Sequence, residues 1–297
     1  MLLDKKIPFK YIISKIKVEL IYILLIALAV NYITRAYVNV IPAIPFVIPT
    51  FLGTAMSVIL SFKLSQSYDR WWEARKIWGG IVNDSRNLIL QLQAFVDDGA
   101  NEEIRKIALR HISWCYSLGQ GLRGLDAAAG LEKNIAEEEL RYLQSQTNKP
   151  LGLLQLNNRS LRKLKENNQV DQYSYVQLNR TMTSLINYMG MAERIKSTIF
   201  PVTYRLFLHM IIYVFIVTLS IALRDLENYI EIPLLVVIAA FFFLIERTAT
   251  HLQDPFSNKP TDTAITAIAR TIEINIRQLL AMDNVPEPQQ PDGFFLN

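Results

Sequence analysis

PTFLGTAMSVILSFKLSQSYDRWWEARKIW, residues 49–78, is the stretch that decides the fold. It begins as an apolar run and becomes polar, aromatic and charged from Lys63 onward, with no proline or glycine after that point until Gly79. A bilayer is crossed by about 20 apolar residues in a helix. The stretch therefore predicts a single helix that leaves a membrane and continues into water.

Two stripes of side chains follow every fourth position of this helix, so that each stripe lies within about 80° around the axis. The first stripe consists of Thr54, Val58 and Phe62. The second consists of small residues, which allow helix backbones to approach closely in membranes: Gly53, Ser57 and Ser61. From these residues two interpretations stay open, namely a pore lining shared by several copies and ordinary packing within one bundle.

The composition indicates a membrane protein with a substantial water-exposed part. Of 297 residues, 51% are hydrophobic, and the formal net charge is +4. Lysines and arginines are spread along the chain among acidic residues, so the charge gives little support for nucleic-acid binding. Cys115 is the only cysteine, which excludes a disulfide within one chain and favours a buried thiol.

Four apolar segments predict four membrane-spanning helices, at residues 18–33, 46–62, 205–223 and 232–245. The last is short, so either its helix continues past Glu246 and Arg247 or the span lies at a locally thin site of the membrane. Five lysines precede the first segment: Lys5, Lys6, Lys10, Lys15 and Lys17. By the positive-inside rule the N-terminus is cytoplasmic, and four spans return the C-terminus to the same side.

The expected fold class is an all-α membrane protein with a helical cytosolic region. Residues 1–66 hold the N-terminal segment and the first two spans, with the pore helix at 46–66. Residues 67–204 form the cytosolic helices, since they show helical and not alternating hydrophobic periodicity. Residues 205–248 hold spans three and four, and residues 249–297 hold a final helix and a proline-rich, disordered tail from Val285 onward.

Known catalytic patterns are missing from the sequence. There is no phosphate-binding glycine loop, nucleophile elbow or HExxH motif, and the three histidines lie far apart at His111, His209 and His251. His209 lies within the third span, where it is either a proton-sensitive group or a hydrogen-bonding bridge between helices. We therefore expect no enzymatic activity, no cofactor and no bound metal.

Two motifs resemble the bestrophin family of ion channels, and most closely its bacterial members. They are SYDRWWEARKIWGGI at residues 67–81 and QDPFSNKPTDT at residues 253–263. The helix at residues 53–62 and the order of the spans extend the similarity over almost the whole chain. The resemblance implies a homopentamer whose second helices surround a central pore above a cytosolic vestibule.

The resemblance also implies two constrictions. The family's hydrophobic neck matches Thr54, Val58 and Phe62, although the family usually places an apolar residue at the first position. A threonine ring is easier to wet, so the barrier to ions is expected to be shorter. When the family's cytosolic aperture is aligned with this chain without gaps, it falls at Tyr173, with Val170 one turn before. The alternative is that Tyr173 is a plain surface tyrosine.

Calcium gating is a further trait of the family's animal members, which carry an acidic cluster after the Pro-Phe pair. Here only Asp254 and Asp262 remain of such a calcium clasp, and Lys259 stands between them. Because calcium is held by several carboxylates, we expect calcium-independent conduction. The two aspartates are expected to cap or orient the final helix.

The sequence thus favours a pentameric channel for monovalent ions in the inner or plasma membrane, with the lipid bilayer and copies of itself as partners. Anions are favoured because aromatic ring edges, such as those of Phe62, are partially positive. Lys63 would add a cationic ring at the pore entrance if it faced the axis, but it points roughly 100° away from Phe62. The alternatives are a cation channel of the same fold and a non-conducting, membrane-anchored interaction protein.

Overall fold

The computed structural model describes residues 1–2 and 8–296, and in this part of the chain the structure is helical. No strand is present among these residues, which carry two isolated bridges, so the all-α class is confirmed. Lys5 and Lys6 of the predicted cytoplasmic cluster lie outside the described residues. The chain divides into two compact units, which are described separately below.

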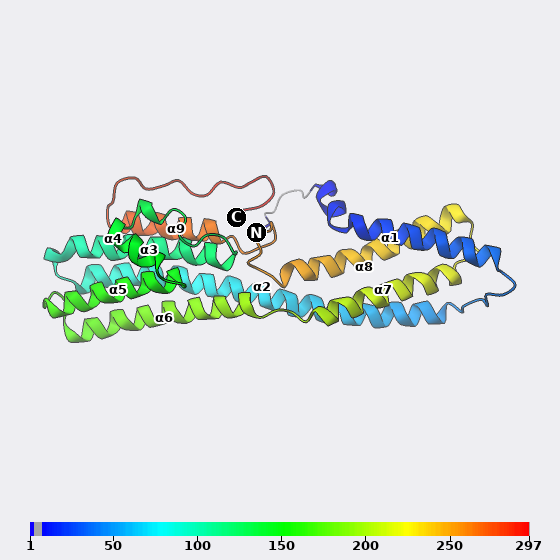
Figure 1. Cartoon of the computed structure of the whole chain (residues 1–297), viewed down its shortest axis with the longest axis horizontal. Coiled ribbons are helices and arrows are strands. Elements are labelled where there is room, and N and C mark those ends of the chain that lie inside the picture. The colour runs from blue at the N-terminus through cyan, green and yellow to red at the C-terminus, as the bar shows by residue number, and fades with distance from the viewer. Residues whose placement is uncertain (3–7, 297) are drawn as a thin grey trace. The chain divides into compact units, whose positions relative to one another are not determined.

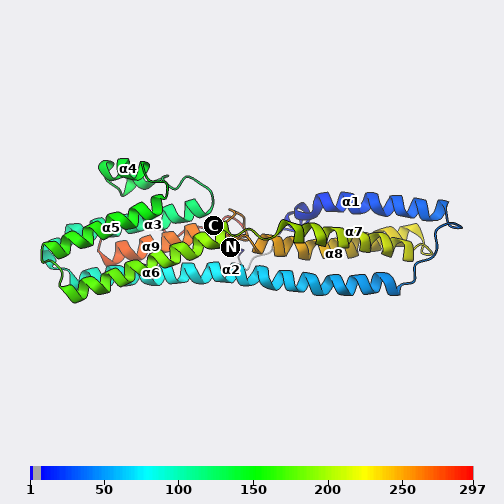
Figure 2. The same cartoon turned by 60° about the horizontal axis from the view of Figure 1, so that its bottom comes forward.

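The membrane unit comprises Lys5–Arg70 and Ile199–Asp254. Its helices are α1 (Phe9–Ala36), the first part of α2 (Val47–Phe95), α7 (Val202–Ala222) and α8 (Asn228–Leu252). α1 packs against α7 and α8, and Figure 2 shows α7 and α8 between α1 and this part of α2. One side of α2 therefore has no other helix of the described chain against it.

Three helices of the described chain are long and apolar enough to cross a membrane: α2, α7 and α8. α8 continues through Glu246 and Arg247 to Leu252, which confirms the predicted extension of the fourth span. α2 is 49 residues long and unbroken, so it also continues past its apolar part as predicted. α1, which holds the first expected span, is not among the three.

The second unit comprises Met1–Asp4, Trp71–Thr198 and Pro255–Asn297. It contains the rest of α2, then α3 (Asn101–Leu122), α4 (Glu137–Gln144), α5 (Lys149–Glu166), α6 (Gln172–Ser197) and α9 (Ile265–Leu279), labelled in Figure 1. Two short 3₁₀ helices, η1 (Asp98–Ala100) and η2 (Leu131–Lys133), join them.

α5 opens with Lys149 and Pro150, and the Asn148 side chain accepts a hydrogen bond from the Leu151 amide at 3.1 Å. Proline is well tolerated there, because the first turn of a helix has no partner for its amide groups.

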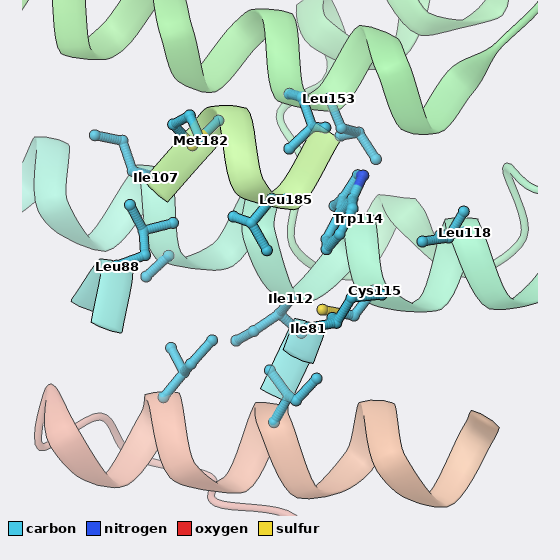
Figure 3. Close-up of a cluster of buried hydrophobic side chains, with 14 of the residues drawn as sticks. Ile81, Leu88, Ile107, Ile112, Trp114, Cys115, Leu118, Leu153, Met182 and Leu185 are labelled. Carbon is cyan, nitrogen blue, oxygen red and sulfur yellow. The ribbon is translucent and has the colours of Figure 1, made fainter. Parts of the chain in front are cut away.

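The core of the second unit lies between α2, α3, α5, α6 and α9. Figure 3 shows side chains from these helices meeting around α3, including Ile81 and Leu88 of α2, Ile112 of α3, Leu153 of α5 and Leu185 of α6. α3 and α9 approach so closely that a Cβ atom on Gly119 would lie 2.5 Å from Cγ2 of Ile265. Only glycine permits that contact without a shift of the neighbour.

The C-terminal tail contacts the N-terminus. Residues 285–296 contain no helix, but they follow a defined path and Phe295 forms an antiparallel bridge with Leu2. The N-terminal ammonium group donates a hydrogen bond to the Leu296 carbonyl at 2.6 Å. Backbone hydrogen bonds thus join this proline-rich segment to the N-terminus.

His111 of α3 is fully buried in this core. Its Nε2 atom lies 2.8 Å from the Ser85 hydroxyl, which donates its own proton to the Ile81 carbonyl, so Nε2 must carry the histidine proton. Nδ1 has no hydrogen-bond partner among the described residues. Burial lowers the pKa of His111 from 6.5 to about 4, because a charge here would be desolvated.

We expect His111 to make stability fall in acid. Below pH 6.5 the unfolded chain binds a proton on this histidine, whereas the folded chain binds it only below about pH 4. The contribution of neutral His111 to stability is therefore fully present above pH 6.5 and is lost as the pH falls from 6.5 to about 4. The loss between pH 7 and pH 5 should be about 2 kcal/mol. Chemical unfolding followed by tryptophan fluorescence measures the loss, and Trp114 contributes to this signal, with its ring stacked on His111 at a centroid distance of 5.2 Å. Parallel pH profiles for the wild type and His111→Gln would contradict the assignment.

Candidate ion pathway on α2

The first part of α2 has one face packed within its own unit and one face left open. Met56, Leu60 and Lys63 are buried. At about 100° per residue the stripe of Thr54, Val58 and Phe62 lies roughly on the opposite side of the helix. This stripe is exposed, with 51% of Val58 and 64% of Phe62 accessible. Within one chain, therefore, the predicted neck residues are not core residues.

Thr54 differs from the other two because it carries a hydroxyl group. That hydroxyl donates to the Thr50 carbonyl of the preceding turn at 2.9 Å. Its only proton is therefore engaged within α2, and its oxygen lone pairs and methyl group remain for other contacts.

The small stripe is divided between two environments. A Cβ atom on Gly53 would lie 3.1 Å from Cε2 of Phe215, so Gly53 packs against α7 as a small residue should. Ser57 and Ser61 are exposed, and the Ser57 hydroxyl donates to the Gly53 carbonyl at 2.8 Å. The predicted packing is thus present at Gly53, while Ser57 and Ser61 have no helix against them in one chain.

Lys63 belongs to a buried ion cluster formed by α2, α7 and α8. Its Nζ atom donates to Oε1 of Glu246 at 2.6 Å and to the Thr250 hydroxyl at 3.0 Å. Thr250 in turn donates to the same Oε1 at 2.8 Å. Nε2 of His209, on α7, lies 3.4 Å from the other oxygen of Glu246.

This cluster corrects the prediction of a possible pore-entrance charge. The Lys63 side chain is 1% exposed and points into the membrane unit, so it does not stand with Phe62 on the open face. His209 of α7 lies beside Glu246 of α8, but this contact does not have hydrogen-bond geometry, so both expected roles of His209 stay predictions. The Lys63–Glu246 pair was missed, because the partners are 183 residues apart and no local spacing joins them.

The predicted aperture residues have opposite environments at the start of α6. Asp171 caps this helix, accepting from the amides of Tyr173 at 2.8 Å and Ser174 at 3.2 Å. Tyr173 is 89% exposed and free to line a passage. Val170 is buried in the core of the second unit, so its assignment to the aperture is wrong. An apolar residue just before a helix cap commonly packs onto the first turn.

Neither of the two remaining aspartates caps the final helix, so of the two roles predicted for them only that of orienting it stays a prediction. The N-cap of α9 is Ala264, which makes no side-chain capping bond. Asp262 is buried, and desolvation raises the pKa of its carboxyl group, with nearby backbone amides and Arg123 acting in the opposite direction. Asp254 is exposed and belongs to the other unit. Among the described residues no group of three or more metal-binding side chains occurs.

The two sequence motifs meet within the second unit. The indole Nε1 of Trp71, in the first motif, donates to the carbonyl of Thr261, in the second, at 3.1 Å. Thr261 directly precedes the buried Asp262. This contact gives a physical reason for the two motifs to occur together.

Comparisons with known proteins agree with this architecture. The sequence profile of the bacterial and fungal bestrophin proteins matches residues 9–278. The voltage-dependent anion channel-forming protein YneE of Escherichia coli K12 is 28% identical over 96% of this chain and 93% of its own length. A protein of the same description from Ralstonia nicotianae is 26% identical over 84% of this chain and 81% of its own length.

Solved structures show the same arrangement of helices. The crystal structure of a bacterial bestrophin homologue from Klebsiella pneumoniae matches with a TM-score of 0.84 and 25% identity, over 91% of this chain and 100% of that one. The family profile spans nearly the whole chain, including both motifs and the open face of α2. The chain therefore belongs to the bestrophin family.

Proposed function

We propose that five copies of this chain form a channel that conducts monovalent anions across the cell membrane, with α2 of each copy lining the pore. The observation that carries the proposal is the exposed stripe of Thr54, Val58 and Phe62, opposite the face that α2 packs within its own unit. On a membrane-spanning helix such a face lies against lipid, another copy of the chain or a passage, and the resemblance to the family's pentameric pore favours the passage. In the pentamer, Ser57 and Ser61 would pack against neighbouring copies and leave the stripe on the axis.

The relatives support the conduction of anions rather than cations. Those compared above are named as anion channel-forming proteins, and channels rather than enzymes are the activity that the family suggests. Since Lys63 is buried, it supplies no cationic ring, and the positive edges of the five Phe62 rings remain as the favourable contact for an anion. The exposed Tyr173 would form the second constriction.

The proposed topology has four spans, with α1 as the first and both termini in the cytoplasm. α1 contributes many exposed apolar side chains, including Ile21, Leu25 and Leu28, and packs on α7 and α8. Conduction is proposed to be independent of calcium, because Asp254 is exposed and Asp262 is buried beside backbone amides and Arg123. No cofactor or metal enters the proposed mechanism.

Reconstitution in planar bilayers under a tenfold potassium chloride gradient tests this function. An anion channel should reverse close to the chloride equilibrium potential, roughly 59 mV from zero for a tenfold ratio. Micromolar calcium, compared with a chelator, should leave the open probability unchanged. A reversal near the potassium potential would replace the proposal by the cation channel, and opening by calcium would overturn its calcium independence.

The mass of the purified protein in mild detergent separates the channel from the interaction protein. A pentamer that conducts agrees with the proposal. A monomer, or a protein that gives no current in any bilayer, would instead favour a membrane-anchored partner-binding role.

A further inference from the structure

A cavity of about 230 Å³ lies in the second unit, between α3, the connection that holds η2, and α9. Three cationic side chains line it: Lys133, Arg270 and Arg277. Glu273 is a carboxylate in the same lining. The charged residues named here therefore sum to a positive charge, and none of them is on the exposed stripe of α2.

Glu273 is the centre of the polar network in this cavity. It accepts a hydrogen bond from the Tyr116 hydroxyl at 2.7 Å and from Nε of Arg277 at 3.0 Å. Nη1 of Arg270 lies 3.7 Å from its second oxygen. One carboxylate thus faces two guanidinium groups, each of which carries five N–H donors in a planar fork. The network holds the arginines in place without neutralising both.

Ser113 adds a polar group that the protein does not satisfy. It is buried at 2% exposure and lines the cavity, and its hydroxyl has no hydrogen-bond partner among the described residues. Ser117, one turn further along α3, donates to the Ala127 carbonyl at 2.6 Å. A buried hydroxyl without a hydrogen bond is unfavourable, so its place in the lining of the same cavity as the arginines indicates a partner that enters the cavity.

We propose that this cavity binds a small molecule through an oxyanion group, either a carboxylate or a phosphate. Arg270 and Arg277 would bind the anion, because the guanidinium fork matches the paired oxygens of both groups. Ser113 would donate its hydroxyl proton to the same ligand. The volume is below the roughly 300–1,000 Å³ of sites for drug-sized ligands, so the ligand is an inorganic anion or a small metabolite and not a dinucleotide.

Calorimetric titration of the full-length channel in detergent at low salt tests the site, with inorganic phosphate and succinate as separate probes. We expect saturable binding of at least one probe, with one site per chain. Arg277→Gln should weaken it about tenfold and Ser113→Ala about fivefold, on the scale of one lost charged and one lost neutral hydrogen bond. Arg162→Gln is the matched control, because Arg162 is exposed on α5 and pairs with Glu166.

Comparing the binding of the two probes to the wild type and the variants tests the proposal. Binding of phosphate alone or of succinate alone identifies which oxyanion the site accepts. If neither probe binds, or if Ser113→Ala and Arg277→Gln bind as tightly as the wild type, the proposal is wrong. Equal weakening in Arg162→Gln would show non-specific attraction and would also overturn it. Ser113→Ala removes only an unpartnered hydroxyl, so it carries the test if Arg277→Gln fails to fold.

Discussion

Replacing Val58 and Phe62 together by alanine should raise the single-channel conductance several-fold. Both side chains are large, apolar and exposed on the open face of α2, where a ring of five would narrow the pore and repel water. A hydrophobic constriction resists ions because it dewets, and smaller side chains widen it and let water remain. Each 1.4 kcal/mol removed from the barrier would increase the rate of passage about tenfold.

The chain offers a closely matched control for this experiment. Val237 and Phe241 of α8 are the same residue types at the same spacing of four, and both are exposed in the membrane unit. The double alanine variant at these positions should conduct as the wild type does. If both double variants changed the conductance equally, or if the Val58 and Phe62 variant changed neither conductance nor selectivity, the neck would have to be placed elsewhere.

Lys63→Met should destabilise the folded channel by about 3–5 kcal/mol, the cost of removing one partner from a buried ion pair. The substitution leaves the Glu246 carboxylate buried and without its ammonium partner at 2.6 Å, although methionine fills a similar volume. The loss of folded protein on heating in detergent, compared with the wild type, measures the effect. Because the pair joins α2 to α8, we expect the gating of the channel to change as well.

A second substitution distinguishes an unpaired charge from lost packing. Lys63→Met combined with Glu246→Leu removes both charges, and most of the stability should return. Lys76→Met on the same helix is the control, since Lys76 pairs with Glu73 at the surface and such pairs contribute about 0–1 kcal/mol. A double variant that is as unstable as Lys63→Met would show that the ion pair is not the cause.

Local patterns in the sequence predicted the helices of the membrane unit, since the four apolar segments correspond to parts of α1, α2, α7 and α8. The unbroken run after Lys63 predicted the continuation of α2, and the shortness of the fourth apolar segment predicted the extension of α8 past Glu246. The spacing of Thr54, Val58 and Phe62 predicted a single stripe, and the structure leaves that stripe exposed. Helical periodicity depends on neighbouring residues, so a single sequence is enough to detect it.

Contacts between distant segments could not be predicted in this way. Lys63 ends an apolar run, which is typical of a membrane-interface anchor, and only the packing of α2 against α8 reveals Glu246 as its partner. Val170 lies one turn from an exposed tyrosine, but the chain turns it inward ahead of the helix cap. The bridge from Phe295 to Leu2 similarly depends on two ends of the chain meeting.

The most direct test of the pore is the reaction of a cysteine at position 58 with a charged, water-soluble thiol reagent during recording. The native Cys115 does not interfere, because burial raises the pKa of its thiol to about 12 and keeps it from forming the reactive thiolate. Val58→Cys channels should lose most of their current irreversibly on reaction, while Val237→Cys channels should not. Unchanged current in Val58→Cys, with labelling of the cysteine confirmed by mass, would contradict the claim that this face of α2 lines the pore.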